Sequence, residues 1–419
     1  MERTASEVAG GSSGEPDLRG RKRESGAHRA ARAGTWRRLF GPALVLVAVA
    51  GAALGQPQHD RELLQAVARY DAEEVKAALA AGADPDARMR PGGRTALMEA
   101  ADRGFANLIP ILLAAGADID ARSADGWTAL MQAAYEGHAE AARRLLAAGA
   151  DVSLRESRYG NTALLVAARR GAADIVRDLL AHGADPGARD TADGNTPLIN
   201  AASAPDWLAP VIARQLLDAG ADPDAAADDG FTPLMAAARA GNPELAVLLL
   251  EHDAAVEAAK ADGATALMVA AEHDHPDVLA RLLAAGADPA RRNARGNSAL
   301  CLAIDARAYG AFRVLLAKSP PAVLSARCRG GLPPIARAAR NADPDLVAAL
   351  LAGGADPNAR GSDGTTALMW AANSGAIDAV RLLLEHGADA ELAADDGWTA
   401  RKAAEMIGYR DIVRLLETR

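Results

Sequence analysis

Aromatic residues are scarce in this chain. Only 3% of the 419 residues are Phe, Trp or Tyr, whereas hydrophobic residues, chiefly Ala and Leu, make up 50%. A core built from such small side chains has to come from closely packed elements of similar shape. We therefore expect many similar helices stacked against one another.

An excess of positive charge is also absent beyond the N-terminal segment. Residues 1–55 contain 9 basic and 5 acidic residues, which leaves 37 basic and 50 acidic residues in the remainder. A surface with this negative balance is a poor match for a phosphate backbone. Nucleic acid is therefore not expected as a partner.

Signatures of catalysis and of cofactor binding are missing as well. The sequence contains no Ser-His-Asp arrangement, no Gly-rich phosphate loop and no Cys cluster with the spacing of a zinc site. We therefore expect no enzyme activity, no cofactor and no small-molecule substrate.

Only one long apolar run occurs, at residues 39–55, and residues 1–38 ahead of it are basic and expected to be disordered. The run ends in Ala-Leu-Gly, which is typical of a secretory signal peptide cleaved before Gln56. Arg37-Arg38 resembles a twin-arginine export motif, although any positive n-region can contain such a pair. Export to the periplasm or the medium is expected. The alternative is an uncleaved membrane anchor, because 17 residues is the lower limit for a spanning helix.

The rest of the chain repeats one phrase. DGWTALMQAA at Asp125 returns as DGFTPLMAAA, DGATALMVAA and DGTTALMWAA, and the glycine that marks each turn recurs every 33 to 36 residues. The marker glycines are Gly93, Gly126, Gly160, Gly194, Gly230, Gly263, Gly296, Gly331, Gly364 and Gly397. A period of this length indicates a stack of supersecondary units that share one continuous core.

The repeat resembles the ankyrin repeat family in its period, in its Thr-Pro-Leu and Ala-Ala phrase, and in its Leu-Leu run ending in Gly-Ala-Asp. The resemblance implies an all-α repeat solenoid in which helix-turn-helix units are joined by β-hairpin-like loops. About eleven units cover residues 59–419, and the first and last are expected to act as caps.

Each residue type in the unit has a physical reason. Thr128 can cap the first helix through its side-chain oxygen, and Pro243 and Pro276 stand where the second helix begins, because that position needs no N–H donor. Gly149 and Gly183 can take the left-handed conformation that ends a second helix. Where the family has a histidine, this chain has a buried Met, which we interpret as core packing rather than copper binding. Those positions are Met98, Met131, Met235, Met268 and Met369.

Two places depart from the repeat. The fifth unit carries three extra residues within 203–210, where Trp207 either packs on a neighbour or marks a protruding loop. The join at residues 319–334 lacks Gly-Ala-Asp and has Pro333 in place of the capping Thr. We predict that this join is the weakest interface of the stack.

Two small clusters offer other chemistry. His273 and His275 give a metal-binding alternative, but they occupy the turn between helices and His-x-His supplies only two ligands. Cys301 aligns with the buried Met position, whereas Cys328 lies near a hairpin tip. We expect their side chains to point apart, although an exported chain could form a disulfide between them.

The resemblance places partner binding on the concave face, at the hairpin ends and the exposed ends of the first helices. Trp, Tyr and Arg are enriched at binding hot spots, so these types identify the candidates, although each aromatic could instead cover its neighbour's hairpin. The candidate contact residues are Trp127, Tyr135, Glu136, Arg169, Arg170, Phe231, Arg239 and Trp398.

The leading hypothesis is an exported, non-catalytic scaffold that binds a partner protein. The alternatives are a membrane-anchored adaptor that keeps residues 39–55 and a metal-binding protein that uses His273 and His275.

Overall fold

The computed structural model describes residues 58–418, so the expected basic segment 1–38 and the export signal 39–55 lie outside the described residues. The described chain forms eleven helix pairs, which we number as units 1 to 11. The first helices are α3 (Gln58–Arg69), α5 (Ala96–Asp102), α7 (Ala129–Glu136), α9 (Ala163–Arg170), α11 (Pro197–Ala201), α13 (Pro233–Ala240), α15 (Ala266–Glu272), α17 (Ala299–Ala306), α20 (Pro334–Arg340), α22 (Ala367–Asn373) and α24 (Ala400–Ile407).

The second helices complete the pairs. They are α4 (Ala72–Ala80), α6 (Ile109–Ala114), α8 (Ala139–Ala147), α10 (Ala173–Ala181), α12 (Ala209–Asp218), α14 (Pro243–Glu251), α16 (Pro276–Ala284), α18 (Tyr309–Lys318), α21 (Pro344–Ala352), α23 (Ile377–Glu385) and α25 (Arg410–Glu417). A short helix, α19 (Ala322–Ser325), follows α18, and β1 (Arg88–Met89) pairs antiparallel with β2 (Arg94–Thr95). None of the helices within residues 58–418 has the length and apolarity needed to span a bilayer.

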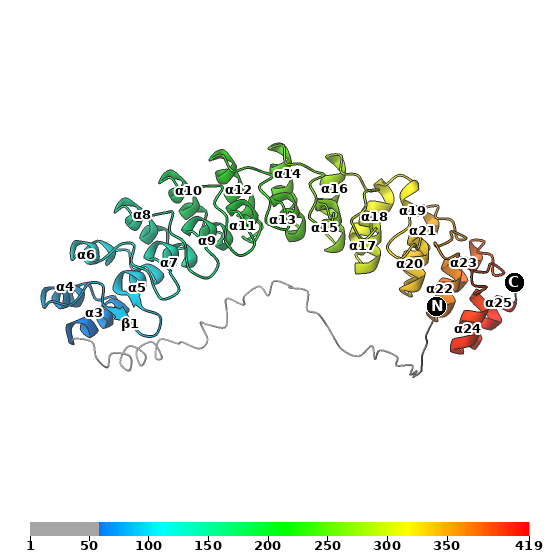
Figure 1. Cartoon of the computed structure of the whole chain (residues 1–419), viewed down its shortest axis with the longest axis horizontal. Helices are drawn as coiled ribbons and strands as arrows, with labels where there is room; N and C mark the ends of the chain where they lie inside the picture. Colours follow the sequence, from blue (N-terminus) through cyan, green and yellow to red (C-terminus); the bar gives the residue numbers. More distant parts are fainter. Residues whose placement is uncertain (1–57, 419) are drawn as a thin grey trace, which may run out of the picture.

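The pairs stack into a curved all-α solenoid (Figure 1). The first helices lie along the concave side and the second helices along the convex side. One core cluster runs from Leu63 in unit 1 to Leu416 in unit 11 and consists mostly of Ala and Leu. The expectation of stacked small-residue helices is confirmed.

Local sequence explains each helix boundary. Thr128 has an extended backbone and its oxygen accepts the N–H of Met131, as an N-cap should. Pro243 and Pro276 stand in the first turn of α14 and α16, as predicted. Gly149 and Gly183 have φ of 89° and 83°, the left-handed conformation that ends a helix. The five Met at the former histidine position are at most 1% exposed, so they belong to the core.

One side of the stack, which we call the hairpin edge, is formed by the loops that open the units. Eight of these loops each donate one backbone hydrogen bond to the loop of the preceding unit, at 2.8 to 3.1 Å. The bonds join Ala124 N to Gly92 O, Ser157 N to Asp125 O, Thr191 N to Tyr159 O, Asp228 N to Asp193 O, Ala261 N to Asp229 O, Ala294 N to Asp262 O, Ser362 N to Gly331 O, and Asp395 N to Asp363 O. These bonds give neighbouring units a common register.

The ladder has one gap, between the loops that open units 8 and 9. In the described chain no backbone bond joins Arg295 to the loop at 328–331; Arg329 N instead donates to Asn297 Oδ1 at 2.9 Å. Pro333 caps α20 without a side-chain hydrogen bond, and α19 is inserted beside this join. The predicted weakness of residues 319–334 stays a prediction, but the missing bond lies at this join.

The expectation that Cys301 and Cys328 point apart is wrong, because the two residues form a disulfide with a Cα–Cα distance of 5.7 Å. Cys328 is not at the tip of its loop but at its base, where its N–H bonds to Leu332 O. This base position faces inward, since the equivalent Ala227 and Ala394 are also buried. The disulfide therefore ties α17 to the next hairpin across the gap in the ladder.

Candidate functional site

In three units the residue before the capping Thr contacts a residue at the end of the same first helix. These two positions are eight residues apart, which is about two helical turns beyond the cap. Trp127 and Tyr135 have ring centroids 5.6 Å apart in an edge-to-face arrangement. Arg239 lies 4.4 Å above the ring of Phe231, and Arg169 donates to Asn161 Oδ1 at 3.4 Å. The same pairing therefore recurs in units 3, 4 and 6.

Arg170 links unit 4 to this pairing in unit 3. Its Nε donates to Tyr135 O at 2.8 Å, and its guanidinium carbon lies 4.4 Å from the centroid of the Tyr135 ring. A cation over a partly exposed aromatic ring contributes on the order of 0.5–1 kcal/mol. Trp127, Tyr135 and Arg170, which we call the Tyr135 cluster, thus form one continuous surface across two units.

Phe231 is less available than its residue type suggests. Phe231 is only 8% exposed, and its ring is contacted by Arg239 and by Lys260, whose Nζ is 5.8 Å from the ring centroid. A partner would therefore meet the two cations before the ring. Lys260, which the sequence did not single out, is part of this group because it comes from the next hairpin.

Arg169 is tied into an internal polar network. Its Nη2 atom lies 3.4 Å from Asn161 Oδ1 and Asn200 Oδ1 and 4.0 Å from Asp190 Oδ2. Asp190 and Glu156 are buried beneath their hairpins. This network fixes the register of units 4 and 5, so Arg169 is more constrained than Arg170.

The buried carboxylate of Glu156 is held ionised by backbone donors. Burial alone would raise its pKa, but N–H groups of Asn161, Arg158 and Tyr159 and the Asn161 side chain outweigh burial and lower the pKa below the ordinary range. Asp190 has the same arrangement, and donors from Asp193 and Asn195 lower its pKa despite burial. Each carboxylate therefore holds its hairpin loop together by accepting several N–H donors from that loop.

Trp398 lies far from the other candidates, in unit 11. Its ring is 5.9 Å from that of Trp370, which in turn donates its Nε1–H to Thr365 Oγ1 at 3.1 Å. Arg340 lies 5.8 Å from the Trp370 ring. The eight candidates therefore form separate groups along the stack rather than one site.

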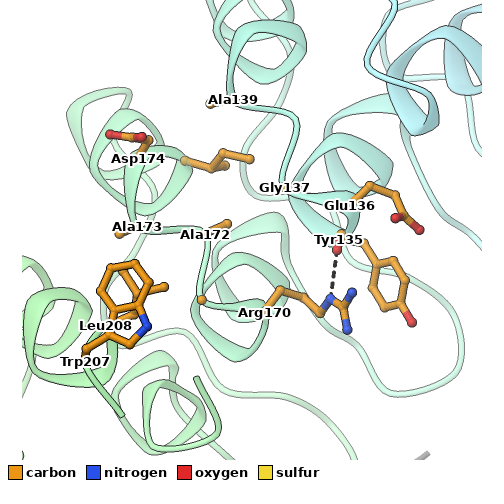
Figure 2. Close-up of a pocket in the computed structure, with 12 residues that line it drawn as sticks. Tyr135, Glu136, Gly137, Ala139, Arg170, Ala172, Ala173, Asp174, Trp207 and Leu208 are labelled. Atoms are coloured by element: carbon orange, nitrogen blue, oxygen red, sulfur yellow. Dashed lines mark hydrogen bonds between the residues drawn. The ribbon is translucent and has the colours of Figure 1, made fainter. Parts of the chain in front are cut away.

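A pocket of about 330 Å³ opens where the turns of units 3, 4 and 5 meet (Figure 2). Tyr135, Glu136 and Arg170 lie on one side, and Trp207 and Leu208 on the other. Trp207 is 73% exposed, so the three-residue insertion in unit 5 forms a protruding loop. This pocket brings three of the eight candidates together with a Trp that was not among them.

Comparison with known proteins agrees with the fold. Models of ankyrin repeats match residues 63–156, 159–191, 209–293, 259–325 and 335–418. The chain belongs to the ankyrin repeat family. Ankyrin repeats are protein–protein interaction modules, and the fold is typically non-catalytic.

Among solved structures, the chain is similar to the ankyrin repeat domain of Bcl-3, a member of the IκB protein family. The two are 29% identical, the match covers 53% of this chain and 99% of that one, and the TM-score is 0.48. No curated protein matches the chain.

Two histidines of this ankyrin stack, His138 and His275, contact the preceding unit. His275 Nε2 lies 3.2 Å from Arg239 O of the preceding unit, and His138 Nε2 lies 3.0 Å from Asp102 O in the same way. His273 Nδ1 is 2.9 Å from Val269 O, and the two rings of His273 and His275 are stacked 6.3 Å apart. No group of three potential metal ligands occurs within residues 58–418. Nothing in this geometry favours the metal-binding alternative.

Proposed function

We propose that this ankyrin repeat protein is exported and acts as a scaffold that binds a partner protein on its concave face. The observation that carries the proposal is the recurring pair at the hairpin end and the first-helix end. Trp127 with Tyr135 and Phe231 with Arg239 put an aromatic ring beside a second ring or a cation. Tyr135 and Arg239 belong to α7 and α13, and the first helices lie along the concave side (Figure 1).

Residue chemistry supports binding of a protein. Rigid aromatic side chains and Arg are the types that contribute most at protein interfaces. The Tyr135 cluster holds its rings and guanidinium in place by contacts within the stack, so a partner would lose little side-chain entropy in ordering them.

The disulfide supports export. Disulfides persist in oxidising compartments and are rare in reducing ones, and Cys301 and Cys328 are paired. The apolar run 39–55 preceded by basic residues points in the same direction. The two features are independent of each other, since one lies in the stack and the other precedes it.

The experiment separates export from binding. The native protein is recovered from soluble extracytoplasmic and membrane fractions, its N-terminus is sequenced, and partners are captured from the fraction that contains it. We expect a chain that starts at or near Gln56 in the soluble fraction. An uncut chain in the membrane would contradict the export proposal and favour the anchored adaptor.

The binding face is tested on the captured partner with Trp127→Ala combined with Arg239→Ala. We expect capture to fall by about tenfold or more, because both residues belong to the recurring pairs. Arg281→Ala is the matched control, because Arg281 is an exposed residue of α16 on the convex side. Equal capture by the double variant and the control would contradict the proposal.

A further inference from the structure

A side chain from the next unit covers most glycines at the turns between first and second helices. A Cβ built on Gly104 would lie 2.7 Å from His138 Nδ1, and one on Gly241 would lie 2.4 Å from His275 Nδ1. Tyr409 covers Gly375 in the same way. We call this series of turns the turn edge of the stack. The usual contact between units at the turn edge is therefore a side-chain ring of one unit packed over the turn glycine of the preceding unit.

Gly137 lacks this cover. A Cβ at Gly137 would meet no atom within 4 Å, and unit 4 has Ala172 where units 3 and 7 have His138 and His275. Ala172, like His138, directly precedes the second helix, and the two have similar backbone angles of −83°, 65° and −82°, 80°. Within residues 58–418, Gly137 is the only turn glycine followed by another unit that has open space above it. The pocket is therefore the space that a ring fills elsewhere.

The walls of this space suit a flat apolar group. Trp207 stands on one side, and on the other Arg170 is held by its hydrogen bond to Tyr135 O and its contact with the Tyr135 ring. Gly137, Ala172 and Ile175 also line the pocket. A volume of about 330 Å³ is at the lower end of ligand pockets, about 300–1,000 Å³, and fits one large side chain with its neighbours.

The negative charge at the rim of the pocket favours a ligand with basic residues next to the inserted side chain. Glu136 is exposed and lines the pocket, and its side chain has no hydrogen bond or ion pair with any described residue. Asp174, also on the rim, pairs with the exposed Arg177 at 2.9 Å. Residues 56–419 carry 50 acidic and 37 basic side chains, so the surrounding field also favours a cation.

We propose that this pocket binds an extended segment of the partner protein that inserts an aromatic side chain over Gly137 and places a Lys or Arg against Glu136. The inference rests on the proposed scaffold function and names the chemistry of its partner. The aromatic ring takes the position that His138 and His275 take over Gly104 and Gly241, while Trp207 and Arg170 contact its faces and edge.

Three short peptides test the ligand chemistry on the full chain. The first has the sequence Gly-Lys-Trp-Lys-Gly with blocked ends, the second has Ala in place of Trp, and the third has Glu in place of both Lys. Calorimetric titration should show binding of the first peptide and at least about tenfold weaker binding of the other two. Equal binding of the Ala peptide or the Glu peptide would overturn the proposal, and so would binding of free indole as tight as that of the first peptide.

Ala172→His tests the location. The introduced imidazole should cover Gly137 as His138 covers Gly104, so binding of the first peptide should fall by about tenfold or more while the fold is kept. Ala172→Ser leaves the space open and should bind like the wild type. Trp207→Ala should also weaken binding, whereas Val211→Ala, an exposed position of α12 outside the pocket, should not. Unchanged binding by Ala172→His would overturn the proposal.

The captured partner distinguishes this inference from the scaffold function. Trp127 and Arg239 do not line the pocket. Capture that is lost with Trp127→Ala and Arg239→Ala but kept with Ala172→His would overturn the pocket proposal and leave the scaffold intact. Capture that is lost with Ala172→His but not with Ala172→Ser would support both.

Discussion

The hairpin edge and the turn edge of this stack respond differently when the repeat is interrupted. At the hairpin edge the one missing backbone bond, between units 8 and 9, is accompanied by the disulfide Cys301–Cys328. Arg337 also spans this join, since it pairs with Asp305 of unit 8 and donates to Arg329 O at 2.8 Å. At the turn edge the missing ring over Gly137 leaves open space.

The difference indicates which edge of the stack fixes the alignment of neighbouring units. The hairpin edge contains backbone N–H and C=O groups, helix N-termini and buried carboxylates. Leaving any of these polar groups without a hydrogen-bond partner costs free energy of folding. The turn edge carries side chains that cover glycines, and the open space there leaves no partner missing for the backbone carbonyl of Tyr135, because Arg170 donates to it. We infer that the hairpin edge holds the stack together and that the turn edge is free to vary for recognition.

Breaking the disulfide should have the largest effect. Cys301→Ser with Cys328→Ser removes a cross-link between residues separated by 27 positions, which should cost about 3 kcal/mol. Units 9 to 11 should then unfold before the rest, so that urea unfolding of the double variant shows two steps. The first of these steps should have a lower urea midpoint than the unfolding of the oxidised protein. An unchanged urea midpoint in the double variant would contradict a stabilising role at this join.

A matched pair of glycines compares a covered turn with the open one. Both Gly137 and Gly241 have positive φ, 80° and 74°, so Ala at either should cost about 1 kcal/mol in backbone strain. Gly241→Ala should cost about 1–2 kcal/mol more, because its Cβ would collide with His275. Thermal unfolding of the two variants measures the difference. Equal losses would mean that the space over Gly137 is not open.

Capping at the hairpin edge gives a smaller effect. Thr128→Ala should destabilise by about 1 kcal/mol, because the N–H of Met131 loses its acceptor. Thr265→Ala is the control, since Thr265 occupies the same position without a side-chain cap bond. Chemical denaturation should show the larger loss for Thr128→Ala, and the reverse order would count against capping as the reason for Thr.

Acid should weaken the hairpin edge through Glu156. Its lowered pKa means that the ionised form stabilises the folded state, so this contribution is present above the ordinary carboxyl range and is lost as the pH falls through the folded pKa. Glu156→Gln should therefore flatten the fall in stability between about pH 5 and pH 2. Glu251→Gln, at an exposed residue of α14, is the control for the loss of one acidic side chain. Parallel profiles for Glu156→Gln and the wild type would rule out this role.

The smallest effect on stability is expected at the turn edge. Trp207 is 73% exposed, so Trp207→Ala should change the free energy of unfolding by less than about 0.5 kcal/mol. A loss of several times this value would show that Trp207 packs for stability, and its exposure would need another explanation.

The sequence predicted the parts of this structure that repeat. The period, the Thr caps, Pro243 and Pro276 at helix starts and the buried Met row all follow from local rules applied unit by unit. The disulfide was missed because the inward direction of Cys328 depends on its place at the base of the hairpin.

The candidate site was predicted only in part. Residue type and register identified Tyr135, Glu136 and Arg170, but which neighbour each contacts depends on packing between units. The pocket itself had a signal that went unused: Ala172 stands where unit 3 has His138 and unit 7 has His275. Trp370 was missed because it lies four residues after its cap rather than before it.

Hydrogen–deuterium exchange of the full chain, with and without its captured partner, tests the account most directly. We predict that the partner slows exchange at the turns of units 3 to 5, in residues 135–139, 170–175 and 205–208, and along the first helices of those units. Slowed exchange confined to the second helices on the convex side, with no change at these turns, would contradict the account.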